Sequence, residues 1–231
     1  YLGDPDFFDV PTFEIVNKSY AKRIYQEILK NPQKSAEQIL PGQLLFDESN
    51  ETTHFSIADQ FGNVISNTYT LNSAYGSGVT ISGTGILMNN EMDDFSGAPG
   101  VPNQFNLIGG IANEIVPEKR PLSSMTPTLI FDNGNPLMAV GSPGGSRIIT
   151  TVLQMILNVI DFSMDINEAT SASRIHHQWY PDRIDIEKSN INTESLIDMG
   201  YEINLIDPAT CTQSIYFEDN MFIGSGDLRR P

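Results

Sequence analysis

The hydrophobic pattern of this 231-residue chain changes its period near Thr52. Before that point, the apolar residues of segment 17–31 recur at helical spacing. The acidic and polar stretch 46–51 that follows is typical of an exposed linker. From Thr52 onward, short segments alternate between apolar and polar residues with a period of two, as strands do. The pattern therefore predicts a boundary that divides the chain into 1–51 and 52–231.

The part after the boundary predicts strand pairs separated by helices. Strands are expected at 55–57, 64–72, 86–88, 128–131, 136–140, 182–187, 201–206, 214–218 and 221–223, and helices at 146–162, 166–172 and 193–199. The first of these helices is largely apolar, which predicts burial on both sides. Segment 96–119 is rich in Gly, Pro and Asn and predicts a long loop. This order of elements favours layers of sheet with helices packed on them.

Charge and cysteine content exclude several classes of function. The chain has 13 Lys and Arg against 29 Asp and Glu, a net charge of −16, whereas a duplex nucleic-acid binder needs a cationic face. We therefore expect no nucleic-acid partner. The single cysteine, Cys211, excludes an intrachain disulfide and a multi-thiolate zinc site. A strand would point His176 and His177 to opposite faces, so we expect neither a metal nor another cofactor.

Three segments carry side chains or backbone groups that could bind a ligand or stabilise a reaction intermediate. Each segment also has a purely structural interpretation. Segment 141–147 (GSPGGSR) ends a strand and opens a helix, so its N–H groups could bind an anion or an oxyanion, or its glycines could serve a tight turn. Segment 89–95 holds three carboxylates and two amides, which suit either a solvated turn or a ligand ammonium. Segment 122–125 is either a loop or a pair of hydroxyls for a carboxylate. The residues alone leave these alternatives open.

Taken together, several separated motifs resemble the γ-glutamyltranspeptidase family. They are the segments 52–56, 68–72, 89–95, 120–128, 141–150 and 174–179, in the family's order and with its gaps. The resemblance covers essentially the whole chain, with 52–231 similar to the family's small subunit and 1–51 similar to the tail of its large subunit. It implies an α+β fold, the four-layer αββα sandwich of N-terminal-nucleophile (Ntn) hydrolases.

The resemblance also implies how the nucleophile arises. Family members are precursors that cut themselves, here between Glu51 and Thr52, so Thr52 would be both the processing residue and the catalytic nucleophile. The freed α-amine, with an ordinary pKa of about 7.7–8.0, is a suitable base for a hydroxyl nucleophile. Thr70 corresponds to the hydroxyl that steadies the nucleophile, and Gly144 and Gly145 to the oxyanion-hole donors.

By the same resemblance, a second group of residues would hold the γ-glutamyl donor. Asn72, Glu91 and Asp94 would bind the α-amino and α-carboxylate ends, with Asp94 on the ammonium, while Ser123 and Ser124 would bind the α-carboxylate. The family reaction is ping-pong: the nucleophile takes the γ-glutamyl group from glutathione or a related amide as an ester. Water, an amino acid or a peptide then accepts it.

Two features set this chain apart from the family pattern. An arginine of the large subunit that clamps the donor's α-carboxylate has no counterpart within these residues. Segment 96–106 matches a lid that in several bacterial members carries a tyrosine bonding to the equivalent of Asn72, but Phe105 stands here, which predicts lid closure by apolar packing.

The resemblance further implies where and with what the protein works. We expect the large subunit as partner, a periplasmic, secreted or cell-surface location for the parent protein, and a chain that is by itself uncut and inactive. Because residues 1–4 contain neither an initiator methionine nor the start of a signal peptide, the chain is expected to be a processed product or an excised piece. The alternatives are a γ-polyglutamate (capsule) hydrolase, an acylase for substrates without an α-amine, which Asp94 argues against, and a non-catalytic module.

Overall fold

The computed structural model describes residues 2–32, 35, 52–98, 100–105, 107–188, 191–219 and 221–230. The linker expected at 46–51 lies outside these residues, as does Glu51 of the expected cleavage site. Among the residues described, none of the helices has the length and apolar character needed to cross a membrane.

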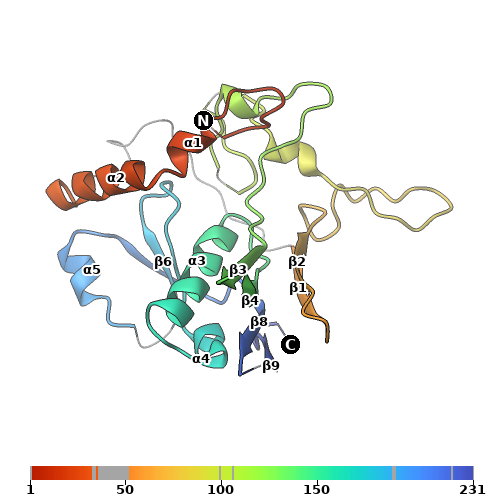
Figure 1. The fold of residues 1–231 in the computed structure, drawn as a ribbon. Coiled ribbons are helices and arrows are strands. Elements are labelled where there is room, and N and C mark those ends of the chain that lie inside the picture. Colours follow the sequence, from red (N-terminus) through yellow and green to blue (C-terminus); the bar gives the residue numbers. More distant parts are fainter. Residues whose placement is uncertain are drawn as a thin grey trace.

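The helices and strands follow one another in the mixed order that the alternating periods predict (Figure 1). The helices are α1 (Thr12–Ile15), α2 (Lys18–Lys30), α3 (Arg147–Ile160), α4 (Ile166–Ser171) and α5 (Glu194–Asp198). The strands are β1 (Thr53–Ala58), β2 (Val64–Tyr69), β3 (Thr128–Asp132), β4 (Asn135–Val140), β5 (Ile175–His176), β6 (Ile184–Glu187), β7 (Ile203–Ile206), β8 (Gln213–Glu218) and β9 (Met221–Gly226). Short 3-10 turns occupy Glu91–Asp94 and Ile111–Asn113.

An antiparallel sheet in the order β3-β4-β8-β9 forms the centre of the molecule. Helices α3 and α4 cover one face of this sheet, and the hydrophobic core lies between the helices and the sheet. It is built from the buried apolar residues Met138, Val140, Ile148, Val152, Met155, Val159, Ile166 and Ala169. α3 supplies four of these at helical spacing, so its buried stripe faces the sheet as an amphipathic helix requires.

The hairpin β1–β2 forms a second layer against the sheet, on the side away from α3 (Figure 1). The hydroxyls of its inner face reach the sheet directly: Ser56 donates to the Gln213 carbonyl at 2.9 Å and Ser66 to the Val140 carbonyl at 3.0 Å. Its outer face carries the exposed side chains of Phe55, Ile57, Ile65 and Tyr69. The described chain thus contains three stacked layers, a helix layer and two sheets, of an α+β sandwich.

His54 fills the space between these two layers. Its Nδ1 lies 2.7 Å from the Thr68 hydroxyl and its Nε2 lies 3.2 Å from the Ser56 hydroxyl. Burial lowers the pKa of His54 to about 4, so the ring is neutral at physiological pH. A methyl group added to Gly141 would lie 2.2 Å from His54 Cε1, which explains why glycine stands where β4 ends. The imidazole thereby sets how closely β1 approaches the loop after β4.

A smaller sheet, β5-β6-β7, lies beside α3. β5 pairs antiparallel with β6, and β6 pairs parallel with β7. The side chain of Gln154 on α3 fastens the two units together, because its amide donates to the Ile175 carbonyl at 2.8 Å and accepts from the Ile175 N–H at 2.9 Å.

Three expectations from the sequence are wrong in detail. The strand expected at 86–88 is only an isolated bridge between Thr80 and Leu87. The strand expected to continue to residue 72 ends at Tyr69, because Asn72 has a φ of 75°, outside the extended region. Helix α3 is buried on one side only; Ile149 and Leu153 on its other side are about half exposed.

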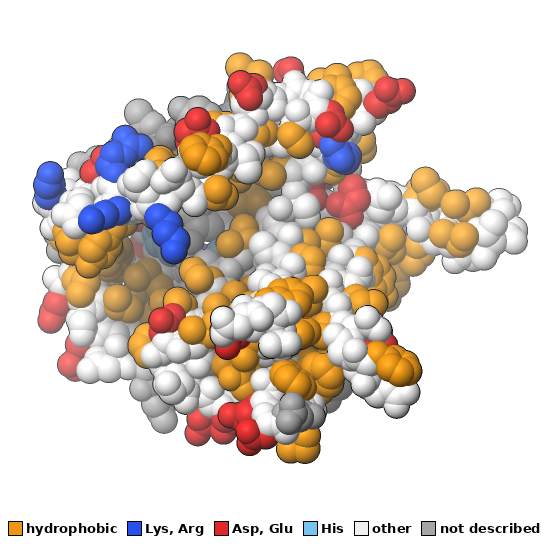
Figure 2. All heavy atoms as spheres, in the orientation of Figure 1, with side chains coloured by type: hydrophobic (Ala, Val, Ile, Leu, Met, Phe, Trp, Pro, Cys, Tyr) orange, Lys and Arg blue, Asp and Glu red, His pale blue; other side chains and the backbone are white. Residues whose placement is uncertain are grey.

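Hydrophobic side chains are also exposed on other parts of the surface. α2 forms where the helical spacing predicts it, with Asn17 as its N-cap, but none of its residues is buried. Figure 2 shows hydrophobic side chains gathered across the face that carries α3 and α4, and Lys and Arg gathered over α2. These apolar surfaces exceed the scattered exposure that a folded monomer usually shows.

Candidate active site

One pocket brings together most of the residues that the sequence singles out. It is lined by Thr52, Thr70, Asn72, Asp94, Phe105, Ser123, Ser124, Met125, Gly145 and Ile148. Of the nine expected site residues, Gly144 and Glu91 do not line it, but each is adjacent to a residue that does: Gly144 precedes Gly145 in the chain, and Glu91 is hydrogen-bonded to Asp94. The lining comes from six separate stretches of chain, which only the tertiary fold brings together.

Thr52 lies at the start of β1, where its hydroxyl faces Thr70 at the end of the paired strand β2. The two hydroxyl oxygens are 3.5 Å apart. The Thr70 oxygen also accepts the backbone N–H of Asn72 at 2.8 Å, which fixes the position of that oxygen. Because β1 and β2 are paired along their length, the sheet register itself sets the spacing of the two threonines.

Gly144 and Gly145 form the turn between β4 and α3. Their φ angles are 131° and 56°, in the region that favours glycine. A methyl group added to Gly144 would lie 2.5 Å from Thr210 Cγ2, so no side chain fits there. Within the described residues, the N–H groups of both glycines donate to no other group. The segment is therefore a tight turn, and it leaves two backbone donors at the start of a helix, which is the geometry that an oxyanion site would use.

The carboxylates of the turn Glu91–Asp94 are the most perturbed acids of the pocket. Burial, together with the neighbouring carboxylates of Glu91 and Asp93, raises the pKa of Asp94 to about 7, while a hydrogen bond from Asn72 opposes this rise. Burial also raises the pKa of Glu91. When both carboxylates are ionised their charges repel each other, and a bound cation would relieve that repulsion.

Ser123 and Ser124 lie on the loop that leads into β3. The Ser123 hydroxyl accepts the Met125 N–H at 3.2 Å, which shapes this loop. Its start is held by Asp4, whose two carboxylate oxygens take both the Nε and a terminal nitrogen of Arg120, at 2.9 and 2.5 Å. This pairing holds the pKa of the Asp4 carboxyl well below its usual range. The N-terminal segment thus fixes the loop that carries the two serines.

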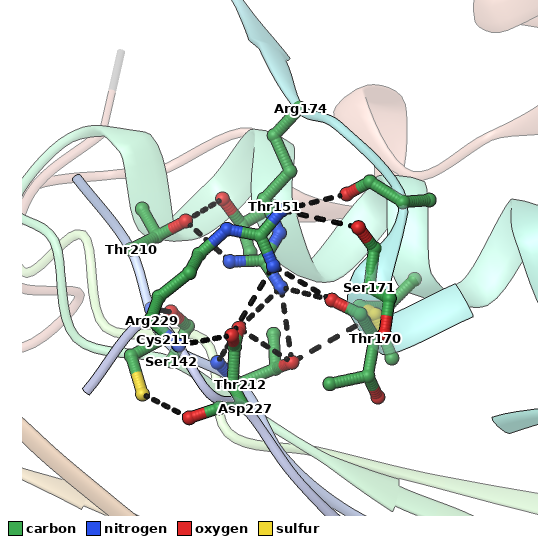
Figure 3. A network of polar contacts seen from close by, with 12 residues as sticks. Ser142, Thr151, Thr170, Ser171, Arg174, Thr210, Cys211, Thr212, Asp227 and Arg229 are labelled. Carbon is green, nitrogen blue, oxygen red and sulfur yellow. Dashed lines mark hydrogen bonds and ion pairs between the residues drawn. The ribbon is translucent and has the colours of Figure 1, made fainter. Parts of the chain in front are cut away.

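A buried ion-pair network surrounds Arg174 and Asp227 (Figure 3). Arg174 pairs with Asp227 at 2.6 Å, and Arg229 pairs with Glu187 at 2.7 Å. Arg174 also donates to the Thr210 hydroxyl at 2.9 Å. Because the methyl group of Thr210 is the one that packs on Gly144, the network supports the turn from behind. No local pattern indicated Asp227 or Arg229, since their partners Arg174 and Glu187 lie 53 and 42 positions away in the chain.

The two adjacent histidines and the cysteine lie in structural surroundings. His176 is buried and His177 is exposed, on opposite faces of the chain. His176 contacts the Thr150 hydroxyl at 2.8 Å and Gln178 at 3.0 Å, which is a structural arrangement. Cys211 is buried, and burial raises the pKa of its thiol. Within the residues described, no group of three or more His, Cys, Asp or Glu is placed to hold a metal.

Sequence comparison points to one family. The family model described as Gamma-glutamyltranspeptidase matches residues 1–231. The glutathione hydrolase proenzyme of Escherichia coli (strain K12) is 49% identical over 232 residues, which cover 99% of this chain and 40% of that protein. The glutathione hydrolase proenzyme of Bacillus subtilis (strain 168) is 37% identical over 190 residues, 76% of this chain and 31% of that protein. The chain therefore spans well under half the length of these relatives.

Comparison with solved structures points to the same family. A mutant of Helicobacter pylori gamma-glutamyltranspeptidase superposes with a TM-score of 0.75 at 50% identity, over 77% of this chain and 100% of the solved chain. The enzyme from Pseudomonas nitroreducens, in complex with L-DON, superposes with a TM-score of 0.74 at 42% identity, over 78% of this chain and 96% of the solved one. These relatives have the Ntn-hydrolase fold, which confirms the expected fold class. The chain belongs to the gamma-glutamyltranspeptidase family.

Proposed function

We propose that the full-length protein is a γ-glutamyltransferase and glutathione hydrolase. One observation carries this proposal: a single pocket holds the Thr52 hydroxyl, Gly145 of the glycine turn and the half-buried carboxyl of Asp94, and the two N–H groups of the turn donate to no other group among the described residues. A nucleophile, donors for an oxyanion and a partner for an ammonium are the groups that transfer of a γ-glutamyl group needs.

In the full-length protein the mechanism begins with cleavage of the Glu51–Thr52 bond, which separates residues 1–51 from residues 52–231. Cleavage frees the α-amine of Thr52, which then takes the proton of the Thr52 hydroxyl as that oxygen attacks the γ-carbonyl of the donor. The N–H groups of Gly144 and Gly145 stabilise the oxyanion that forms, and Thr70 holds the nucleophile in place. Loss of the leaving amine gives a γ-glutamyl ester, which water or an amine then resolves.

The donor is recognised through the two charged groups of its glutamyl part, the α-ammonium and the α-carboxylate. Asp94, supported by Asn72 and Glu91, pairs with the α-ammonium, and Ser123 and Ser124 bind the α-carboxylate. The proenzymes from E. coli and B. subtilis are named for glutathione hydrolysis, which supports glutathione as a donor. Amino acids or peptides serve as acceptors.

The missing part of the protein completes the site. The large subunit covers the apolar faces left exposed on β1–β2 and α3 and supplies a cation for the donor's carboxylate, so the chain alone is uncut and inactive. We place the parent protein in the periplasm, at the cell surface or outside the cell.

The specificity constant for a γ-glutamyl donor should rise as the pH passes through about 7. Below that pH, Asp94 is protonated and neutral, so it is a poor partner for an ammonium. Replacing Glu91 by Gln removes the adjacent negative charge, lowers the pKa of Asp94 and should move the midpoint of kcat/KM toward lower pH. A profile that does not move in Glu91→Gln would assign the transition to another group, such as the Thr52 amine.

The activity itself is tested with matched anilides. Full-length protein should turn over γ-glutamyl-p-nitroanilide and discriminate against glutaryl-p-nitroanilide by about 10-fold or more, since the second compound lacks only the ammonium that Asp94 binds. Equal rates on the two compounds would favour an acylase. Preference for polyglutamate over both would favour the capsule-type hydrolase, and turnover of none of them would favour a non-catalytic module.

A further inference from the structure

Gln178 connects three parts of the site. It follows β5, and its side-chain oxygen accepts the Ser146 hydroxyl, directly after the glycine turn, and the Nε2–H of His176 at 3.0 Å. Its side-chain nitrogen donates to the carbonyl of Tyr180 at 2.9 Å and to the carbonyl of Phe105 at 3.3 Å. All the hydrogen-bonding capacity of one amide is therefore directed to these four groups.

The orientation of this amide follows from its partners. The Phe105 and Tyr180 carbonyls can only accept hydrogen bonds, so the group facing them must be the NH₂. The oxygen then faces Ser146 and His176, and the imidazole donates from Nε2 while its Nδ1 lies 2.8 Å from the Thr150 hydroxyl. Burial lowers the pKa of His176, which favours the neutral ring.

Phe105 belongs to the stretch 96–106 that the resemblance matches to a lid. Residues 100–105 of this stretch are called the lid segment. Phe105 is only 6% exposed and lines the same pocket as Thr52, next to Met125 and Ile148, as the expected apolar closure requires. The neighbouring residue of the segment is held by the turn Glu91–Asp94, because the Gln104 N–H donates to Asp93 at 2.8 Å. The Ser73 hydroxyl also donates to the Gln104 side chain at 3.1 Å, and the bond from Gln178 to Phe105 joins the segment to the strand end beside the glycine turn.

We propose that Gln178 is a positioning residue that latches the lid segment over the nucleophile, through the Phe105 carbonyl, and couples it to the glycine turn through Ser146. Phenylalanine at position 105 has no hydroxyl with which to fasten the lid, so a hydrogen bond to its main-chain carbonyl serves instead. The effect on catalysis rests on the proposed function, whereas the latch itself is a property of the fold.

Glutamate at position 178 removes the latch with little change of shape. Gln178→Glu keeps an oxygen for Ser146 and His176, but it loses both N–H donors and places a carboxylate oxygen against two carbonyls. The matched control is Gln154→Glu, which removes donors between α3 and β5 away from the pocket. If the glutamate variant does not fold, Gln178→Met takes its place. Methionine has a similar volume and no donor, so the same loosening of the lid segment is expected.

Limited digestion of full-length protein with chymotrypsin reports on the latch. Chymotrypsin cleaves after Phe105 only when that residue leaves its buried position. Peptide mapping should show cleavage there about five- to tenfold faster in Gln178→Glu, because protection from proteolysis falls with the loss of local hydrogen bonds. Cleavage at other sites, and at Phe105 in Gln154→Glu, should stay within about twofold of wild type.

Kinetics with γ-glutamyl-p-nitroanilide give a second readout. A loosened lid should raise KM about three- to tenfold with kcat changed by less than about twofold, because the nucleophile and its donors are untouched. Unchanged cleavage after Phe105, or an equal rise at all sites or in the control, would overturn the latch. Absence of turnover by wild-type protein would instead overturn the proposed function and leave the digestion result standing.

Discussion

Replacing Thr52 by Ala in the full-length protein is expected to leave one uncut chain with no measurable γ-glutamyl transfer. The hydroxyl that would attack the preceding carbonyl is gone, so the α-amine is never freed and the acyl ester has no oxygen to form on. We expect kcat/KM for γ-glutamyl-p-nitroanilide to fall by about 10⁴-fold or more, as when other enzymes lose their nucleophile. Gel electrophoresis reports the processing, and anilide release reports the transfer.

Thr53→Ala is the matched control, because it removes the same side chain one residue along the same strand, from an exposed position. It should be processed and active. If the Thr52→Ala protein still yields two subunits, another residue cuts the precursor. If it retains transfer, Thr52 is not the nucleophile.

Replacing Asp227 by Ala should have the largest effect on stability. Arg174 and Asp227 have side chains only 6% and 2% exposed, and their nitrogen and oxygen are 2.6 Å apart. Removing the carboxylate leaves a guanidinium buried without its main partner, which costs about 3–5 kcal/mol of unfolding free energy. The Thr212 N–H loses its acceptor as well. Because Arg174 also holds Thr210 against Gly144, kcat should fall in the protein that does fold.

A surface ion pair provides the control for this variant. Lys188 and Asp207 are also in close contact, at 2.8 Å, but their side chains are 60% and 84% exposed. Asp207→Ala should therefore change the free energy of unfolding by less than about 1 kcal/mol. Urea titration of both variants measures the difference, and equal midpoints would contradict the structural role assigned to the network.

Local patterns predicted most of the secondary structure because they depend on neighbours in the chain. The alternation at β1 and β2, the turn residues between β3 and β4 and the helical spacing of α2 all lie within short windows. The errors arose where tertiary contacts decide. The Gly-rich stretch around residue 86 can bridge but has no further strand to pair with, and α3 has a bare apolar side because the described chain supplies only one surface for it to pack on.

The residues of the site also fall into those that a local pattern predicted and those that it did not. The place of the glycine turn between a strand and a helix predicted both a tight turn and a donor site; the structure confirms the tight turn, and the donor site stays a prediction. The roles of Thr52 and Asp94 came from the resemblance, because a threonine at a strand start and an acidic turn are ordinary features by themselves. No local pattern indicated Gln178 or Asp227, since each acts on residues more than fifty positions away or across several elements.

The central claim is that Thr52, once freed, carries the γ-glutamyl group, and mass spectrometry of the reacting protein tests it most directly. Full-length protein is mixed with γ-glutamyl-p-nitroanilide, quenched in acid during turnover, and its fragments are weighed and mapped. We predict a fragment that begins at Thr52 and carries the added mass of one γ-glutamyl group on that residue. An uncut chain during turnover, or a γ-glutamyl group on any other residue, would contradict the claim.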